Sequence, residues 1–155
     1  MAGDKAGAMR VLAAGFRFSH DVANGGTLFA TVAAKTLLIQ HLRAAEFALQ
    51  VAELSTAQRL VLQKVITQLG PDGLDWHSAM KRELELLQGV NSEAMAQIIP
   101  SYLSALNNAS QLPGLQRMIA TAPHPIPEVI PNPKRVLEQK QNLTDKLLQA
   151  RSRLQ

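Results

Sequence analysis

The 155-residue chain contains no cysteine, and this absence removes several classes of site. Without thiols the chain can form no disulfide framework, no thiolate zinc site and no cysteine nucleophile. Aromatic residues make up only 4% of the chain, and β-branched residues are outnumbered by leucine, alanine, glutamine and other good helix formers. This composition favours an all-α fold, and the length fits one globular domain.

Long hydrophobic runs are also absent. A membrane-spanning helix needs about 20 largely apolar residues, whereas the most apolar stretch, residues 25–40, is shorter and contains Lys35. The first ten residues, MAGDKAGAMR, lack the basic start and continuous apolar run of a secretory leader. We therefore expect no membrane span, and the chain as it stands indicates a cytoplasmic protein or a mature, processed one.

Acidic residues are scarce in one region only. From Lys134 to Gln155 six basic residues accompany two acidic ones, which accounts for the whole net charge of +4. These basic residues are spread around the predicted helix and lack interleaved aromatic residues. The pattern is more typical of a solvated helix face than of a nucleic-acid surface, so we expect no nucleic-acid partner.

What the chain has in abundance is apolar, helix-forming sequence, and the longest such stretch runs from Gly25 to Leu54. From Thr27 to Ile39 only Lys35 is charged, and the apolar side chains fall on several sides of a helix: Leu28, Val32, Leu38 and Ile39. Beyond Gln40 a narrower stripe continues at helical spacing, with Leu42, Ala45, Leu49 and Ala52. We expect a buried central helix in a bundle of about five to seven helices.

The first helix is predicted from Met9 to about His20, after a flexible tail at residues 1–8. Ala-Asn-Gly-Gly at 23–26 ends it, because glycine and asparagine tolerate positive φ. Its inner face is predicted from the spacing of the apolar residues Met9, Leu12 and Phe16, joined less strongly by Val11 and Phe18.

Capping signals predict where the next helices of the bundle begin. Ser55 with Gln58 forms a capping box for a helix over 56–69, and Asp75 can cap a helix over 76–88. A further helix begins at 91–93 and continues towards Leu106, with a break or kink expected at Pro100. Pro113 fits the first turn of a short helix that ends near Ile119, and the bundle domain is predicted to span 9–122.

A proline-rich strap and a basic amphipathic helix follow the bundle. Residues 123–133 hold five of the eight prolines, which predicts an extended segment. Residues 134–155 predict a helix capped by Asn132, with an apolar stripe at Val136, Leu143, Leu147 and Leu154. Each leucine is worth roughly 1.5–3 kcal/mol when buried, so we expect the stripe to be covered by the bundle or by a partner, with a modest bias towards self-association.

The polar residues form no recognisable catalytic, cofactor or metal motif. The four histidines are His20, His41, His77 and His124, and none has a second ligand at the i, i+4 spacing of a helical zinc site. His20 and Asp21 are neighbours in sequence and point to different sides of a helix. The sequence therefore predicts no metal, no cofactor and no catalytic residue.

The segments MRVLAAGFRFSHDVANGGTLFATVAAKTLLIQ and ALQVAELSTAQRLVLQKVITQL have a recognisable order of features within residues 9–90. A helix ends at a Gly-Gly turn, and an apolar helix, an Ala-Leu-rich segment and a Ser-capped helix follow. This order resembles a group of uncharacterised exported bacterial helical proteins. The resemblance implies a periplasmic or otherwise extracytoplasmic domain, and it implies no site residue because that group has no established activity.

Two functions remain open from the sequence. The first is a non-enzymatic interaction or scaffold domain that binds a protein partner, or a second copy, through the C-terminal stripe. The second is a small-ligand or enzyme domain in which polar residues such as His20, Asp21, His77 and Glu83 converge only in the fold. Binding of the last helix to a membrane surface is a weaker alternative, because its apolar side lacks Trp and Phe.

Overall fold

The computed structural model describes residues 4–51 and 54–154, and within these ranges it contains helices and no strand. This confirms the all-α helical bundle predicted from the sequence. The elements are α1 (Lys5–Ala23), α2 (Leu28–Val51), α3 (Thr56–Gln68), α4 (Trp76–Leu86), α5 (Ser92–Asn107), the 3₁₀ turn η1 (Ala109–Gln111), α6 (Leu112–Ala120), α7 (Ile126–Val129) and α8 (Pro133–Leu154).

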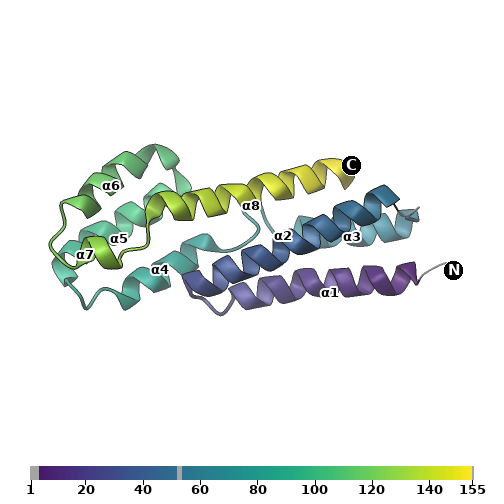
Figure 1. The fold of residues 1–155 in the computed structure, drawn as a ribbon, viewed down its shortest axis with the longest axis horizontal. Helices are drawn as coiled ribbons and strands as arrows, with labels where there is room; N and C mark the ends of the chain where they lie inside the picture. The colour runs from purple at the N-terminus through teal and green to yellow at the C-terminus, as the bar shows by residue number, and fades with distance from the viewer. Residues whose placement is uncertain (1–3, 52–53, 155) are drawn as a thin grey trace.

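The last helix, α8, runs along most of the length of the molecule (Figure 1). It lies parallel to α2, with which it makes contacts between Lys35 and Gln139 and between Glu46 and Arg153. Towards one end of the molecule α8 packs against α2 and α3, and towards the other end it packs against α6 and contacts α5 through Lys140 and Leu106 (Figure 1). One continuous hydrophobic core therefore joins both ends.

Local capping explains where several helices begin. Ser55 and Gln58 form the predicted capping box: the Ser55 hydroxyl accepts from the Gln58 N–H at 3.3 Å, and the Gln58 side chain accepts from the Ser55 N–H at 2.9 Å. Asp75 accepts from the N–H of Ser78 at 2.9 Å, and Asn132 accepts from that of Arg135 at 3.2 Å. These bonds satisfy N–H groups that have no partner within the helix.

The structure corrects two predictions about the chain ends and the strap. The expected flexible tail at 1–8 is helical from Lys5, because the Asp4 carboxylate caps the helix by accepting from the Gly7 N–H at 2.7 Å; residues 1–3 lie outside the described part. The strap at 123–133 is not wholly extended, since Ile126–Val129 forms a helical turn. Pro125 is the N-cap of this turn and Pro127 lies within it, where no N–H donor is needed.

Helix α5 passes through Pro100 without the predicted break. Pro100 is exposed, while the opposite side of α5 is anchored in the core by Met95, Ile98 and Tyr102. The Tyr102 hydroxyl also donates to the Pro131 carbonyl at 2.8 Å, and burial raises the pKa of Tyr102. Packing of this kind outweighs the loss of one backbone hydrogen bond at proline.

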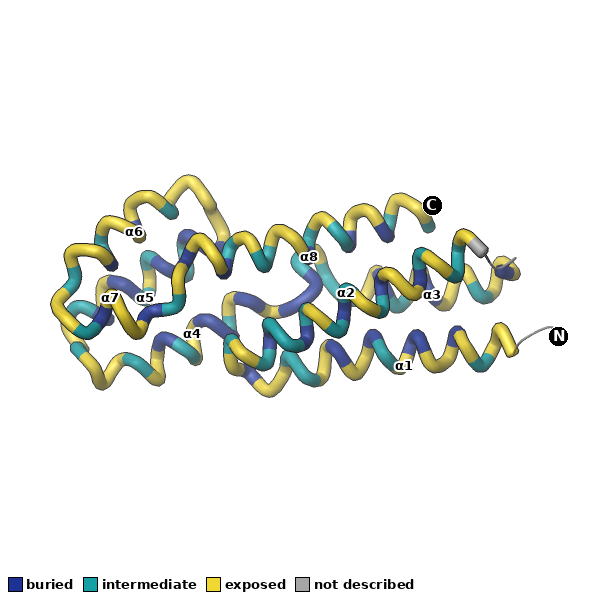
Figure 2. The backbone as a smooth tube through the Cα atoms, viewed as in Figure 1, coloured by how far each residue is buried: buried dark blue, intermediate teal, exposed yellow. Residues whose placement is uncertain are grey.

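The central helix is buried on fewer sides than predicted. Within Thr27–Ile39 only Thr31, Ala34 and Leu38 are fully buried, whereas Leu28, Val32 and Ile39 are partly buried. The side of α2 that faces neither α1 nor α8 is open to solvent (Figure 2). Of the stripe predicted beyond Gln40, Ala52 lies outside the described residues.

Candidate functional site

Helices α1 and α2 form an antiparallel hairpin that is joined near its middle by Ser19 and His41. Ser19 has no exposed surface, and its hydroxyl lies 3.0 Å from the Gly15 carbonyl and 3.0 Å from Nδ1 of His41. A carbonyl can only accept, so the hydroxyl proton goes to Gly15 when Nδ1 of His41 carries a proton, and it can go to His41 when Nδ1 does not. In either tautomer the contact links the two helices.

This serine and histidine are not arranged for nucleophilic chemistry. A nucleophilic serine must be accessible to its substrate, whereas Ser19 has no exposed surface. The His41 ring packs against Phe16, with ring centroids 5.8 Å apart, and lies over Gly15. Burial lowers the pKa of His41. These contacts stiffen the hairpin.

The outward side of the same hairpin carries exposed aromatic residues. The chain has four phenylalanines, and only Phe16 is buried. Phe29 is 84% exposed, Phe47 is 64% exposed and Phe18 is 59% exposed, with Val11 of α1 at 73%. Single exposed apolar side chains are common in folded proteins, and a group of them on one hairpin marks a candidate binding surface.

Helical geometry places Phe29 and Phe47 on one face of α2, and Val11 and Phe18 on one face of α1. Phe29 and Phe47 are eighteen residues, or about five turns, apart on α2, and Val11 and Phe18 are about two turns apart on α1. His41 lies between the levels of Gly15 and Ser19. In an antiparallel pair this register puts Phe18 near the level of Gln40 and Val11 near that of Phe47. We call these four residues the aromatic strip: Val11, Phe18, Phe29 and Phe47.

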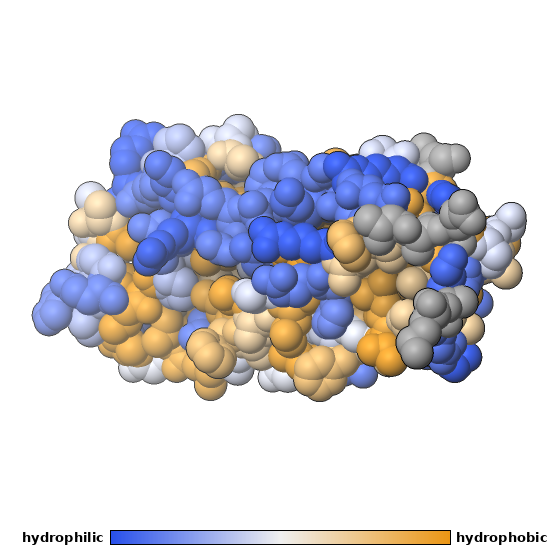
Figure 3. Space-filling view, turned by 45° about the vertical axis from the view of Figure 1, so that its right-hand side comes forward, coloured by the Kyte–Doolittle hydropathy of each residue, from blue (hydrophilic) through white to orange (hydrophobic). Residues whose placement is uncertain are grey.

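The aromatic strip faces away from α3 and α8, which cover the other side of the hairpin. In the space-filling view hydrophobic residues gather over the lower part of the molecule, below a band of hydrophilic residues (Figure 3). The three exposed phenylalanines alone present roughly 400 Å² of aromatic surface, since a phenylalanine has about 200 Å² to bury. This surface is distributed along about five turns of α2.

Of the two covers expected for the C-terminal stripe, the bundle or a partner, the bundle provides one in this structure. Leu143 and Leu147 have no exposed surface, Val136 is 6% exposed and Leu154 is partly buried. The strap returns the helix along the bundle, so the chain covers its own stripe. A partner could reach these side chains only if α8 left the bundle, and the stripe is therefore not a free docking surface in this structure.

Three of the six basic residues after position 133 also serve the fold. Lys140 forms an ion pair with Asp72 at 3.0 Å and donates to the Leu106 carbonyl at 2.9 Å. Arg153 pairs with Glu46 at 3.4 Å. Arg151 donates to the carbonyls of Ile66 and Gly70, at 3.3 and 2.5 Å, and so compensates the C-terminal end of α3. Part of the positive charge of α8 therefore holds the helix against the bundle.

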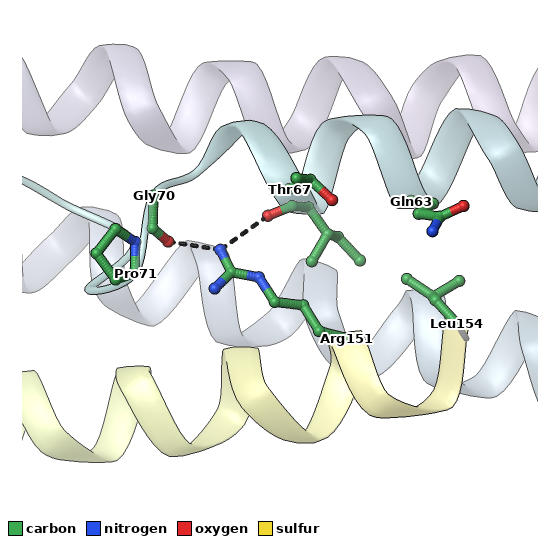
Figure 4. A pocket seen from close by; sticks show the side chains of 7 residues that line it. Gln63, Thr67, Gly70, Pro71, Arg151 and Leu154 are labelled. Atoms are coloured by element: carbon green, nitrogen blue, oxygen red, sulfur yellow. Dashed lines mark hydrogen bonds between the residues drawn. The ribbon is translucent and has the colours of Figure 1, made fainter.

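Arg151 also borders a hollow of about 420 Å³ between α3 and α8 (Figure 4). The hollow is lined by Gln63, Thr67, Pro71 and Leu154 as well, and the guanidinium group is turned towards the backbone at Gly70 rather than into open space (Figure 4). Its Nε is buried and has no hydrogen-bond partner. The arrangement is explained by the capping of α3 and offers a ligand few free polar groups.

The polar residues of the rival hypothesis do not gather in one place. His20 and Asp21 border a hollow of about 250 Å³ between α1 and α3, with 3.8 Å between Nδ1 and the carboxylate and both side chains more than half exposed. Glu83 instead accepts from the Leu28 N–H at 3.3 Å, and His77 is exposed at the start of α4. An ion pair this solvated interacts weakly.

Three further comparisons bear on function. No protein-family model, curated protein or solved structure matches the chain. Among the residues that the structure describes, no group of three or more histidine, aspartate or glutamate side chains could hold a metal ion. None of the helices in those ranges combines the length and hydropathy that crossing a membrane requires.

The aromatic strip escaped the sequence reasoning, although one signal for it was present. Leu38 is nine residues from both Phe29 and Phe47, which is two and a half turns, so it must lie on the opposite side of α2. If Leu38 is buried, both phenylalanines point outwards. The apolar residues around α2 instead predicted burial on several sides, and the spacing along α1 predicted Val11 and Phe18 on its inner face.

Proposed function

We propose that this protein is a non-enzymatic helical interaction domain and that the aromatic strip is its docking surface. The observation that carries the proposal is the exposure of three of the four phenylalanines on one hairpin. Covering a fully exposed phenylalanine stabilises a complex by roughly 1.5–3 kcal/mol, and aromatic residues are enriched at the centres of protein interfaces.

The hairpin also offers the rigidity that such a surface needs. The Ser19–His41 bond and the packing of the His41 ring on Gly15 and Phe16 fix α1 against α2 from the inner side. A partner therefore meets side chains that are already held in place, and less conformational entropy is lost when it binds.

Site-specific photo-cross-linking tests the proposal. A photoreactive phenylalanine analogue replaces Phe29 or Phe47 in the full chain, expressed in its source cells, and Asn142, an exposed residue of α8, is replaced as the control. We expect discrete cross-linked products from positions 29 and 47, reduced by the additional change Phe18→Ser, and none from position 142. Equal yields at all three positions, or no product at positions 29 and 47, would contradict the proposal.

A further inference from the structure

We infer that the aromatic strip binds a second copy of this chain, with the two α2 helices packed antiparallel about a two-fold axis at the level of Leu38. The inference rests on the proposed function and adds the identity of the partner. The observation that carries it is a symmetry in the outward face of α2, whose residues lie at equal distances before and after Leu38.

Six residues of α2 form this outward face, which we call the α2 row. At about 100° per residue they all lie within about 40° of one direction, and the buried Leu38 lies on the opposite side. Five of them are exposed and one, an alanine, is partly buried. The row consists of Phe29, Ala33, Thr36, Gln40, Arg43 and Phe47. Its spacings of four, three, four, three and four residues read the same in both directions along the helix.

A symmetric row is what a two-fold interface requires, because the same surface must serve both copies. In an antiparallel pair each residue of the row faces the residue of the second copy that lies equally far from Leu38 on its other side. Phe29 therefore faces Phe47 of the second copy, and this contact occurs twice, at the two ends of the interface. Alternating spacings of three and four residues are those of helices that pack at a crossing angle of about 20°.

The polar residues at the centre of the row are complementary as well. Thr36 faces Gln40 of the second copy in this arrangement. The Thr36 hydroxyl already donates its proton to the Val32 carbonyl at 3.1 Å, so its oxygen is left to accept a hydrogen bond from the Gln40 side-chain amide. A polar contact within an otherwise apolar helix pair fixes the register of the two helices.

The charge in the row does not oppose the pairing. Arg43 is its one charged residue, and it faces Ala33 of the second copy, whose small side chain leaves room for the arginine stem. The two Arg43 residues are separated by ten positions, or about 15 Å along the helices, a distance at which salt screens their repulsion. Phe29 precedes Ala33 by about one turn, so the guanidinium group can lie over the aromatic ring of the second copy.

The exposed residues of α1 fit the same arrangement. Phe18 lies near the level of Gln40, beside the central polar contact, and covers it from one side. Arg17 and Asp21 border the hollow between α1 and α3, to the side of the strip, and lie one turn apart. Their opposite charges offset each other at the edge of the interface.

The size of the contact indicates a reversible dimer. The exposed phenylalanines of one copy present roughly 400 Å², so pairing covers roughly 800 Å² of aromatic surface, to which the rest of the α2 row adds. Stable interfaces bury about 1,200 Å² or more, and transient ones lie below that size. We expect a dissociation constant in about the micromolar range.

Sedimentation equilibrium of the full-length protein tests the pairing. Between about 1 and 200 µM the wild type should change from monomer to dimer. Phe29→Ser/Phe47→Ser should weaken dimerisation at least about hundredfold, because four phenylalanines lose their contacts in each dimer. Leu148→Ser changes an exposed leucine of α8 outside the strip, and this matched control should dimerise like the wild type.

Cysteine cross-linking tests the register, since the chain has no cysteine of its own. A mixture of Ala33→Cys and Arg43→Cys proteins should form a disulfide-linked dimer on mild oxidation, because these positions face each other. Neither protein should cross-link alone, because the two copies of one position are about 15 Å apart along the helices and a disulfide needs Cα atoms within about 7 Å. Asn142→Cys, exposed on α8, should not cross-link to Ala33→Cys.

The outcomes separate this inference from the proposed function. A protein that stays monomeric at every concentration would overturn the second copy, and photo-cross-linking at positions 29 and 47 would then decide the docking surface separately. Dimers that persist in Phe29→Ser/Phe47→Ser, or that cross-link through Arg43→Cys alone, would overturn the antiparallel pairing along α2. A monomer that binds phosphatidylglycerol vesicles through Phe29 and Phe47 would replace the second copy with a lipid surface and leave the docking surface standing.

Discussion

Nδ1 of His41 on α2 lies 3.0 Å from the hydroxyl oxygen of Ser19 on α1, and this hydroxyl also lies 3.0 Å from the Gly15 carbonyl. The two contacts connect the backbone of one helix to a side chain of the other through a hydroxyl that has no exposed surface. Removing one partner of a buried hydrogen bond destabilises the fold, because the remaining polar group has lost its hydration and has no partner in the protein. The hairpin should therefore respond to any change in the protonation of His41.

The stability of the protein should decrease in mild acid because of His41. Burial lowers its pKa in the folded state below the ordinary value of 6.5, so the unfolded chain binds the proton more readily. The contribution of His41 is complete above about pH 6.5 and is lost as the pH falls towards the folded-state pKa. Urea unfolding at several pH values should show this decrease.

Two variants separate His41 from the other titrating groups. His41→Gln should flatten the decrease of unfolding free energy between pH 7 and pH 5, relative to the wild type, by removing the titrating group. His20→Gln changes an exposed histidine of the same hairpin and serves as the control for the substitution itself. If the unfolding free energy of His41→Gln depends on pH as that of the wild type does, protonation of His41 is not the cause of the decrease in stability.

Gly15 should be intolerant of a side chain. An added Cβ would lie 2.4 Å from Nε2 of His41, so the ring would have to move away from Phe16 or the helices would have to separate. We expect Gly15→Ala to lower the unfolding free energy by about 1–3 kcal/mol. Gly114→Ala in α6 is the matched control, because its Cβ would meet nothing within 4 Å and the change should stabilise by about 0.4–1 kcal/mol. Equal effects at both positions would argue against close packing of the hairpin.

The docking of α8 can be tested with two adjacent leucines. Leu147 has no exposed surface, whereas Leu148 is 56% exposed. Leu147→Ala should reduce the unfolding free energy by about 2–5 kcal/mol, and Leu148→Ala should change it by less than about 0.5 kcal/mol. Chemical denaturation of the two variants measures the difference. If both variants unfold like the wild type, α8 does not belong to the folded core.

Much of the fold was predictable because the relevant signals are local. Ser55 and Asp75 cap helices through hydrogen bonds to residues three positions later, and Asn132 does the same for α8. Such bonds depend on a few neighbouring residues, so the sequence alone reveals them. Pro100 and the strap were predicted less well, because tertiary packing around Tyr102, Ile126 and Ile130 decides their conformation.

The candidate site was not predicted, because exposure depends on which neighbours cover a helix. The sequence left open whether the bundle or a partner covers Leu143 and Leu147, and in the structure α2 and α3 cover them. Phe29 and Phe47 were not singled out from the sequence of the most apolar helix, and both are exposed in the structure. The apolar pattern identifies side chains that favour burial. Only the tertiary structure shows which of them the chain itself buries.

The central claim is that the aromatic strip serves binding and contributes little to folding. The unfolding free energy of the triple variant Phe18→Ser/Phe29→Ser/Phe47→Ser tests it most directly, with Phe16→Ala as the buried counterpart. We predict that the triple variant stays within about 0.5 kcal/mol per site of the wild type, while Phe16→Ala loses about 3–5 kcal/mol. A loss of several kcal/mol in the triple variant, comparable to that of Phe16→Ala, would place these phenylalanines in the core and contradict the claim.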